Sequence, residues 1–398
     1  MIPKFLNHIV SSLLVRNAAP ETPKDVAVDA TAAPGIRTVP SVRTNNALSE
    51  QPPHCPHNRR LEMMSGDWFQ AWAGTVEKPN NDLLVTTSGN LVERNNEDRF
   101  RLSCTADGGI VAGVSDGAGG QGLYCGDWAE RLLTRLPQSP IDTDTQLNEW
   151  LDSFWEEFQQ EFKERARIDP FLFRKFVKEG SYATLAAMWL RPDVNGIKLN
   201  ALLYGDSALF VWRLADGRPA LRIAYPDKAT TFLHDPYLLN WQAAAKSEKL
   251  EVLVDFAVAP GDTIVMASDG MGQYLLLRSL YGTPLAEQSE IASQLAQEVE
   301  EIRVSHPNKL AVLARAHAQD HGPSFAEEFS VIRQGFGDVE AFAKFIGQRF
   351  QKGLLPNDDC TLVIVNIGTD PVTGFPLTGR STERRSISIG KPKMVGER

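Results

Sequence analysis

The chain has 398 residues, with 41 Lys and Arg against 50 Asp and Glu, which gives a formal net charge of −9. With 42% hydrophobic and 23% charged residues, its composition is that of an ordinary soluble globular protein and excludes a wholly disordered chain or a fibrous repeat. The acidic balance argues against a protein that neutralises a nucleic-acid backbone, so we expect no nucleic-acid partner.

Composition changes along the chain predict a folded domain between two flexible ends. Residues 17–60 are rich in Ala and Pro and nearly free of aromatic residues, so they cannot bury enough apolar surface to offset their ordering entropy. The end of the chain is rich in Gly, Ser, Thr, Arg and Lys. We predict a flexible N-terminal extension at 1–60, one domain at 61–368 and a flexible tail at 369–398.

Secretion and a membrane span are both disfavoured. The first 16 residues contain only a short, Ser-interrupted apolar stretch, unlike a signal peptide. No apolar run reaches the roughly 18 residues that a membrane helix needs. The 4 cysteines are scattered and form no CxxC pair, which is not the pattern of a disulfide scaffold. We expect a cytoplasmic, monomeric protein without a membrane span.

Short runs rich in β-branched residues predict strands, and longer periodic runs predict helices. The strand-like runs are 83–87, 99–102, 110–115, 183–190, 198–204, 208–214, 221–225, 250–258, 263–267 and 361–367. The helix-like runs are 122–136, 145–167, 285–304 and 339–351. Strands in runs with helices in blocks favour an α+β layered sandwich over a doubly wound sheet.

Acidic residues lie at the ends of several strand-like runs. They are Glu97-Asp98, Asp116, Asp206, Asp269 and Asp358. One Asp-Gly pair is ordinary turn chemistry, but five such places in one domain are harder to explain by turns alone. If the sheets bring these carboxylates together, their repulsion requires cations, and hard divalent ions with oxygen ligands fit best.

Six short motifs around these acids occur in one order. They are Asn95-Asn96-Glu97-Asp98, Val114-Ser115-Asp116-Gly117-Ala118-Gly119-Gly120, Gly180-Ser181-Tyr182-Ala183-Thr184, Gly205-Asp206-Ser207, Ala267-Ser268-Asp269-Gly270 and Asp358-Asp359-Cys360-Thr361. This set resembles the metal-dependent protein phosphatases of the PP2C type, in their bacterial form. The resemblance implies an antiparallel β-sandwich with helices on both outer faces, in α/β/β/α layers, and a binuclear Mn²⁺ or Mg²⁺ site at one edge.

The resemblance also implies roles for individual residues. Asp116 would bridge the two metals, and the second metal would take the backbone carbonyl of Gly117 and the carboxylate of Glu97. Asp98 would hold metal-bound water and so act in catalysis.

The remaining acids follow from the same resemblance. Asp269 and Asp358 match ligands of the first metal, and Asp206 matches a residue that helps to bind a weaker third metal. Two cations about 3.5–4 Å apart lower the pKa of a shared water, and the resulting hydroxide attacks phosphorus in line. The implied activity is hydrolysis of phosphoserine and phosphothreonine on proteins, opposing a partner kinase in signalling.

The residue that should grip the phosphate is out of register. Relatives place an Arg four residues before the motif's Glu, where this chain has Glu93, and Arg94 follows one residue later. A one-residue slip in a strand reverses the side-chain direction unless a bulge corrects it. Arg94 is therefore one candidate for the catalytic and substrate-binding Arg. Alternatively, Arg99 binds the phosphate, or Arg94 faces solvent and has no such role.

Two further departures leave a second function open. Ala118 stands where some relatives have a His that protonates the leaving group, and Gln273 stands where some have a metal-binding Asp. The latter leaves Asp206 with the alternative role of a turn acid. A phosphatase-like binding or sensor module with little turnover is therefore the alternative function.

A third possibility comes from residues 117–122, which match the GxGxxG pattern of dinucleotide-binding enzymes. Asp116 would direct a carboxylate towards the pyrophosphate, and the following helix leads into Pro137-Gln138-Ser139-Pro140 instead of a second strand. The context disfavours an oxidoreductase.

Overall fold

The computed structural model describes residues 59–66, 68–80, 84–85, 91–92, 96–120, 122–193, 196–215, 218–305, 307–368 and 383–387. Most of the predicted N-terminal extension, residues 1–58, lies outside this part of the chain, as does Arg94.

Two antiparallel sheets form the centre of the domain. The first contains β1 (Arg59–Gly66), β2 (Phe69–Val76), β10 (Ala208–Ala215), β11 (Arg218–Tyr225), β14 (Asp262–Ala267), β15 (Cys360–Ile367) and β16 (Glu383–Ile387). Its order is β11-β10-β14-β15-β2-β1-β16. The second contains β5 (Arg99–Cys104), β6 (Ile110–Ser115), β8 (Leu185–Asp193), β9 (Gly196–Tyr204) and β13 (Leu250–Val258), in the order β13-β9-β8-β6-β5.

Two pairs of two-residue strands complete the β-structure of the described residues. They are β3 (Leu84–Val85) with β4 (Leu91–Val92), and β7 (Tyr182–Ala183) with β12 (Leu239–Asn240).

Alternate residues of the central strands face opposite layers. Val363 and Val365 of β15 pack into the core between the sheets, together with Phe100 and Met188 of the second sheet. Leu362 of the same strand belongs instead to the core beneath the helices. Because side chains of a strand alternate between its faces, a strand covered on both sides is apolar throughout. All eight residues of β15 are accordingly buried.

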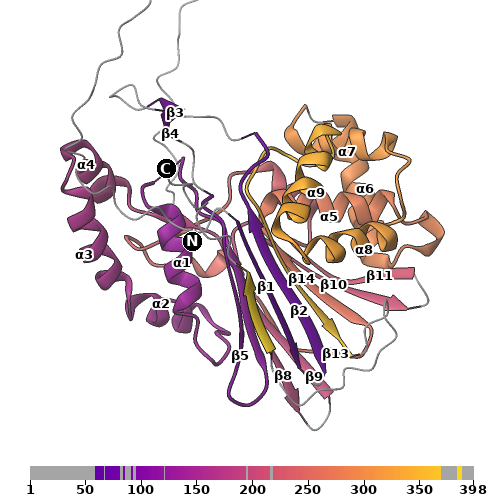
Figure 1. Ribbon diagram of the computed structural model, residues 1–398, viewed down its shortest axis with the longest axis horizontal. Coiled ribbons are helices and arrows are strands. Elements are labelled where there is room, and N and C mark those ends of the chain that lie inside the picture. Colours follow the sequence, from indigo (N-terminus) through magenta and orange to yellow (C-terminus); the bar gives the residue numbers. More distant parts are fainter. Residues whose placement is uncertain are drawn as a thin grey trace, which may run out of the picture. The chain divides into compact units, whose positions relative to one another are not determined.

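Helices cover both outer faces of the sandwich (Figure 1). The second sheet carries α1 (Cys125–Thr134), α2 (Asp144–Asp152), α3 (Trp155–Ala166) and α4 (Pro170–Glu179). The first sheet carries α5 (Asp269–Tyr281), α6 (Glu290–Ser305), α7 (Lys309–Gln319), α8 (Phe325–Gly335) and α9 (Val339–Gln351). Short 3-10 helices are η1 (Ala229–Leu233), η2 (Ser247–Lys249) and η3 (Leu285–Glu287). Within the described ranges, every helix is too short or too polar to cross a lipid bilayer.

The predicted fold class, an α+β antiparallel sandwich between helical layers, is confirmed. Several details differ from the prediction. The helix expected over 145–167 is two helices, α2 and α3, because the chain leaves the helical conformation at Phe154 (φ −148°). Five residues of the predicted tail form β16, which pairs antiparallel with β1.

A buried ion pair connects the helices above the first sheet. Glu328 of α8 is 1% exposed and accepts hydrogen bonds from Nε (2.6 Å) and Nη2 (2.9 Å) of Arg349 in α9. The hydroxyl of Tyr274 in α5 donates to the same carboxylate. The three helices are therefore joined through one carboxylate.

We predict that Glu328→Gln lowers the free energy of unfolding by about 3 kcal/mol, because the charge of Arg349, whose side chain is 14% exposed, then loses its carboxylate partner. Urea denaturation of the metal-free protein measures this. The exposed Glu287 offers the matched control, and Glu287→Gln should change stability by less than about 0.5 kcal/mol. Equal effects of the two substitutions would contradict this role for Glu328.

Candidate metal centre

The acids singled out in the sequence lie at strand ends of both sheets. Asp116 follows β6, and Asp206 lies between β9 and β10. Asp269 is the first residue of α5 and is separated from the end of β14 by Ser268, and Asp358 stands just before β15. The antiparallel pairing of β14 with β15 places the end of one beside the start of the other, with Ala267 opposite Leu362.

Hydrogen bonds between the loops fix these positions. Ser268 N donates to Thr361 O (3.0 Å) and Thr361 N to Ser268 Oγ (3.0 Å), which holds the start of α5 against the start of β15. Thr184 Oγ1 accepts a hydrogen bond from Asp116 N (2.9 Å) and lies 2.6 Å from Ser207 Oγ. The loops carrying Asp116 and Asp206 are thereby linked.

The structure brings Asp98, Asp116, Asp206, Asp269 and Asp358 within electrostatic reach of one another. Burial raises the pKa of Asp116 well above its usual range, and the other four aspartates add to that effect. Burial and the charge of Asp269 raise the pKa of Asp206 to about 8. Burial and Asp358 raise the pKa of Asp269 to about 6. The cluster therefore resists carrying its full negative charge.

Asp98 is the most enclosed of these acids. Its side chain is 1% exposed, and its Oδ2 finds no hydrogen-bond partner among the described residues. Burial, followed by repulsion from Asp359, raises the pKa of Asp98 well above its usual range. A buried oxygen without a partner is costly, so this atom is suited to receive a cation or a polarised water.

Glu97 and Gly117 converge on one amide. The N–H of Gly119 donates to the carbonyl oxygen of Gly117 (2.9 Å) and to Oε2 of Glu97 (3.1 Å). These are the two oxygens that the sequence resemblance assigns to a second metal. Burial and the charge of Asp359 raise the pKa of Glu97 to about 7, although the Gly119 amide acts in the opposite direction.

Asp359 has a structural role of its own that the sequence did not reveal. Its Oδ2 accepts a hydrogen bond from Glu97 N (2.9 Å), and its Oδ1 accepts one from Lys78 N (2.9 Å). It therefore positions the loop that carries Glu97 against the end of β2. Its place directly after Asp358 could have indicated this role. Neighbouring side chains point in different directions from the backbone, so two adjacent acids seldom share one task.

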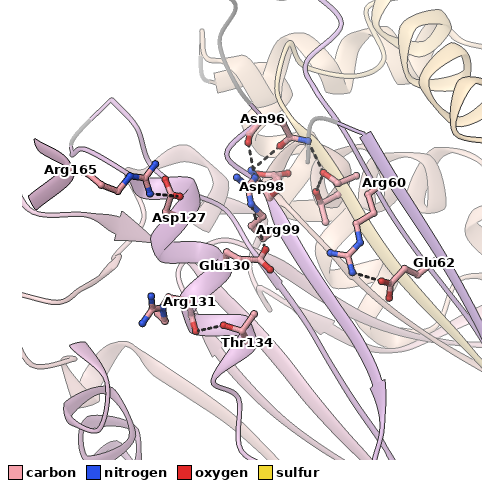
Figure 2. A network of polar contacts seen from close by, with 12 residues as sticks. Arg60, Glu62, Asn96, Asp98, Arg99, Asp127, Glu130, Arg131, Thr134 and Arg165 are labelled. Carbon is pink, nitrogen blue, oxygen red and sulfur yellow. Dashed lines mark hydrogen bonds and ion pairs between the residues drawn. The ribbon is translucent and has the colours of Figure 1, made fainter. Parts of the chain in front are cut away.

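Arg99 stabilises this loop from within. It is 4% exposed, and its Nη1 donates to the carbonyl oxygens of Asn96 (2.7 Å) and Asp98 (2.8 Å). Figure 2 shows its guanidinium between this loop and Glu130 of α1. These contacts favour a positioning role over the alternative of a phosphate-binding Arg99.

Gln273 lies in the first turns of α5 and serves Asp269. Its Nε2 donates to Asp269 Oδ2 (3.3 Å), and the side chain is 3% exposed. An acid at this position would add to the repulsion within the cluster, whereas the amide supplies a donor.

The donor set fits a hard divalent cation. All the groups are carboxylate or carbonyl oxygens, and Mg²⁺ keeps several of its own waters and needs few protein ligands. Among the described residues, no three acidic, His or Cys side chains converge tightly enough to enclose an ion as they stand. Asp116, Asp269 and Asp358 could hold an ion on one side of the cluster, and Glu97 with Gly117 on the other.

No protein-family model matches the chain, and no curated protein matches its sequence. Several solved bacterial phosphatases are similar in structure. The serine/threonine phosphatase Stp1 from Staphylococcus aureus has 12% identity and a TM-score of 0.38, over 75% of this chain and 95% of that chain. The PPM Ser-Thr phosphatase MsPP from Mycobacterium smegmatis, in complex with cacodylate, has 18% identity and a TM-score of 0.35, over 75% and 98%.

The catalytic domain of the serine threonine protein phosphatase PstP, in complex with two manganese ions, has 16% identity and a TM-score of 0.34, over 77% of this chain and 99% of that chain. At such scores the likeness decides nothing about activity, which has to be argued from the site.

The raised pKa values predict how the stability of the metal-free protein depends on pH. The ordinary values are 3.8 for Asp206 and 4.5 for Glu97, so the folded state holds protons that the unfolded state has released. The contribution of these two protonated side chains to stability is complete below about pH 4. It is lost as pH rises through about 7 for Glu97 and about 8 for Asp206. We expect the melting temperature in EDTA to fall by several degrees from pH 6.5 to 8.5.

This interval also avoids an opposing group. Burial lowers the pKa of His317 to about 4, so its effect on stability lies below about pH 6.5, its ordinary value. Thermal denaturation in EDTA measures the change, and Asp206→Asn should reduce the decline. A melting temperature that rises across this interval would exclude the proposed repulsion.

Two adjacent glycines provide a second test of the site. A Cβ added at Gly119 would overlap the carboxylate of Glu97, whereas one added at Gly120 would meet nothing within 4 Å. We expect Gly119→Ala to weaken Mn²⁺ binding by about 10-fold or more, which is the usual effect of disturbing an outer-shell contact. Gly120→Ala should bind as the wild type does. Isothermal titration calorimetry distinguishes them, and equal affinities would contradict the assignment of Glu97.

Proposed function

We propose that this protein is a metal-dependent protein phosphatase that hydrolyses phosphoserine and phosphothreonine with Mn²⁺ or Mg²⁺. The observation that carries the proposal is the gathering of five buried or half-buried aspartates, from both sheets, at one edge of the sandwich. Such a cluster is unfavourable unless cations bind it. The order of the six sequence motifs supports the same activity.

Asp116 lies centrally among the acids, where it would contact both cations. Asp269 and Asp358 would hold the first cation, and Glu97 with the carbonyl of Gly117 would hold the second. When bound, two divalent cations lower the pKa of a water and neutralise charge on a phosphoryl group. A weak third cation at Asp206 is part of the proposal.

Asp98 would orient the attacking water, because its Oδ2 is buried and has no hydrogen-bond partner among the described residues. Hydrolysis by water needs no Cys or Ser nucleophile. The side chain of Ala118 has no acidic group that could donate a proton, so water or the substrate itself must protonate the leaving alkoxide. We keep Arg94 as the proposed ligand of the substrate phosphate.

The proposal extends to organisation and partners. Residues 61–368 would form the phosphatase domain, between an extension at 1–60, whose last two residues begin β1, and a tail at 369–398, whose residues 383–387 pair with β1. The substrate would be a phosphoprotein, and a Ser/Thr kinase of the same pathway would be the functional partner. We propose a cytoplasmic monomer of bacterial type.

One observation favours the alternative of a phosphatase-like sensor with little turnover. Donors of the protein itself already contact the proposed ligands, since the Gly119 amide binds Glu97 and the Lys309 ammonium binds Asp358. A module of this kind would bind Mn²⁺ or a phosphoprotein and hydrolyse neither peptides nor small phosphoesters.

Asp116→Asn should lower kcat/KM for a phosphothreonine peptide by more than about 100-fold with Mn²⁺, because losing a bridging ligand costs more than losing an outer-shell contact. Phosphate release measures this. Asp152 is exposed on α2, and Asp152→Asn, with the same change of charge, should match the wild type. Mn²⁺ binding without hydrolysis by the wild type would favour the sensor. If Asp116→Asn hydrolyses the peptide as well as the wild type does, Asp116 is a ligand of neither cation.

A further inference from the structure

Lys309 places a positive charge on the candidate metal centre. Its Nζ lies 3.1 Å from Oδ2 of Asp358, within hydrogen-bonding distance. Lys309 is the first residue of α7, and the preceding Asn308 caps this helix by accepting a hydrogen bond from Ala311 N (2.8 Å). The helical layer above the first sheet thus reaches the acids of the sandwich edge.

The position of this lysine is unfavourable for the helix. The N-terminus of a helix carries a partial positive charge, so a cation in the first turn opposes the helix dipole. The contact with Asp358 compensates for this placement. Lys309 therefore fits the demands of the acidic cluster better than those of its own helix.

The charge of Lys309 acts on other acids of the cluster besides Asp358. The nearby charges of Asp269 and Asp358 raise the pKa of Lys309 even though burial acts to lower it. In return, Lys309 lowers the pKa of Asp206 and Asp269, against the effect of their burial. Lys78 and Arg99 act on the other side of the cluster, around Glu97. Lys309 is thus a counter-charge for the side that contains Asp269 and Asp358.

The ammonium can leave this place. The side chain of Lys309 is 53% exposed, so it lies at the rim of the cluster and is not locked into the core. A lysine side chain is a point charge on a flexible four-carbon stem. A rotation about that stem would carry the charge into solvent without moving α7.

We propose that Lys309 is a tethered competitor of the divalent cation at Asp358 and thereby sets the metal affinity of this side of the centre. This inference rests on the proposed function, since it requires that Asp358 binds a metal. Mg²⁺ approaches a carboxylate oxygen to about 2.0–2.1 Å, and an ammonium 3.1 Å from the same oxygen would repel it. Metal binding must therefore displace Lys309 from Asp358.

This competition is reciprocal. If the ammonium lowers the affinity for the metal, then the metal lowers the affinity of Asp358 for the ammonium by the same factor. In the metal-free protein Lys309 reduces the repulsion among the acids, and in the loaded protein its ammonium is released to solvent. A metal ion would then bind at Asp358 only when its concentration is high enough to displace Lys309.

The test is a calorimetric titration of the full-length, EDTA-treated protein with Mn²⁺ alone. Lys309→Met should lower the Kd of the tightest site about 5- to 10-fold, at the low end of the usual coupling between two interacting ligands. Lys309→Arg keeps the charge and should stay close to the wild type. Lys178 of α4 is exposed, and Lys178→Met makes the same change of net charge far along the chain, with no expected effect on the Kd.

Thermal denaturation gives a readout that needs no metal. In EDTA, Lys309→Met should melt at a lower temperature than Lys178→Met, because the acids lose their counter-charge. Excess Mn²⁺ should reverse that order or remove the difference. Lys309→Gln, which keeps a polar side chain, should behave as Lys309→Met does in both measurements.

The outcomes separate this inference from the function on which it rests. If the wild type binds Mn²⁺ and Lys309→Met binds it equally or more weakly, the competition is refuted and the metal centre stands. If the wild type binds no Mn²⁺, the proposed function and the inference both fail. A tighter Kd in Lys178→Met as well would assign the effect to net charge and refute the role of Lys309.

Discussion

Repulsion among carboxylates at one edge of the sandwich is the constraint on which the rest of the structure depends. Asp116 and Asp269 come from different sheets and would separate if only their charges mattered. They are held together because Val363, Met188 and their neighbours bury a continuous core between the sheets. Hydrophobic burial is roughly proportional to the apolar area removed from water, and it opposes a repulsion confined to a few atoms. The two sheets therefore supply the force that keeps an unfavourable site assembled.

The same constraint explains the donors that surround the acids. The Gly119 amide contacts two oxygens at once, Arg99 braces the loop of Glu97 and Asp98, and Gln273 donates to Asp269. Each of these groups reduces local negative potential without closing the site. In the part of the chain that the structure describes, the acids are thus restrained by dipoles and by the charges of Lys78, Arg99 and Lys309, a state in which they remain accessible to divalent cations.

Much of the fold follows from local patterns. The strands β6 and β13 begin and end where the sequence predicts, because their β-branched runs are bounded by turns. The helix α5 could not be predicted in this way. It is buried along almost its whole length, from Gly270 to Leu280, so its sequence lacks the apolar periodicity that marks a helix lying on a surface. The strands β1 and β2 were also missed, since they follow directly on a segment whose composition predicts a linker.

Some residues of the candidate site could likewise be predicted from local sequence, whereas others depend on contacts between distant parts of the chain. The aspartates could be identified from their places at the ends of strands, and their order along the chain carried the family resemblance. Lys309 could not be predicted, because nothing in its local sequence links the start of α7 to Asp358, 49 residues away. Gly119 lay within a quoted motif, yet its close approach to Glu97 depends on how two loops meet in space.

The adjacent residues Asp358 and Asp359 contact different parts of the structure. Asp358 belongs to the acidic cluster, and Asp359 receives the backbone amides of Lys78 and Glu97. Inserting or deleting one residue before β15 would exchange these two tasks and damage both. The spacing between this pair and the start of β15 is therefore fixed. Among chains of this architecture, insertions and deletions should therefore be rare between Asp359 and the start of β15.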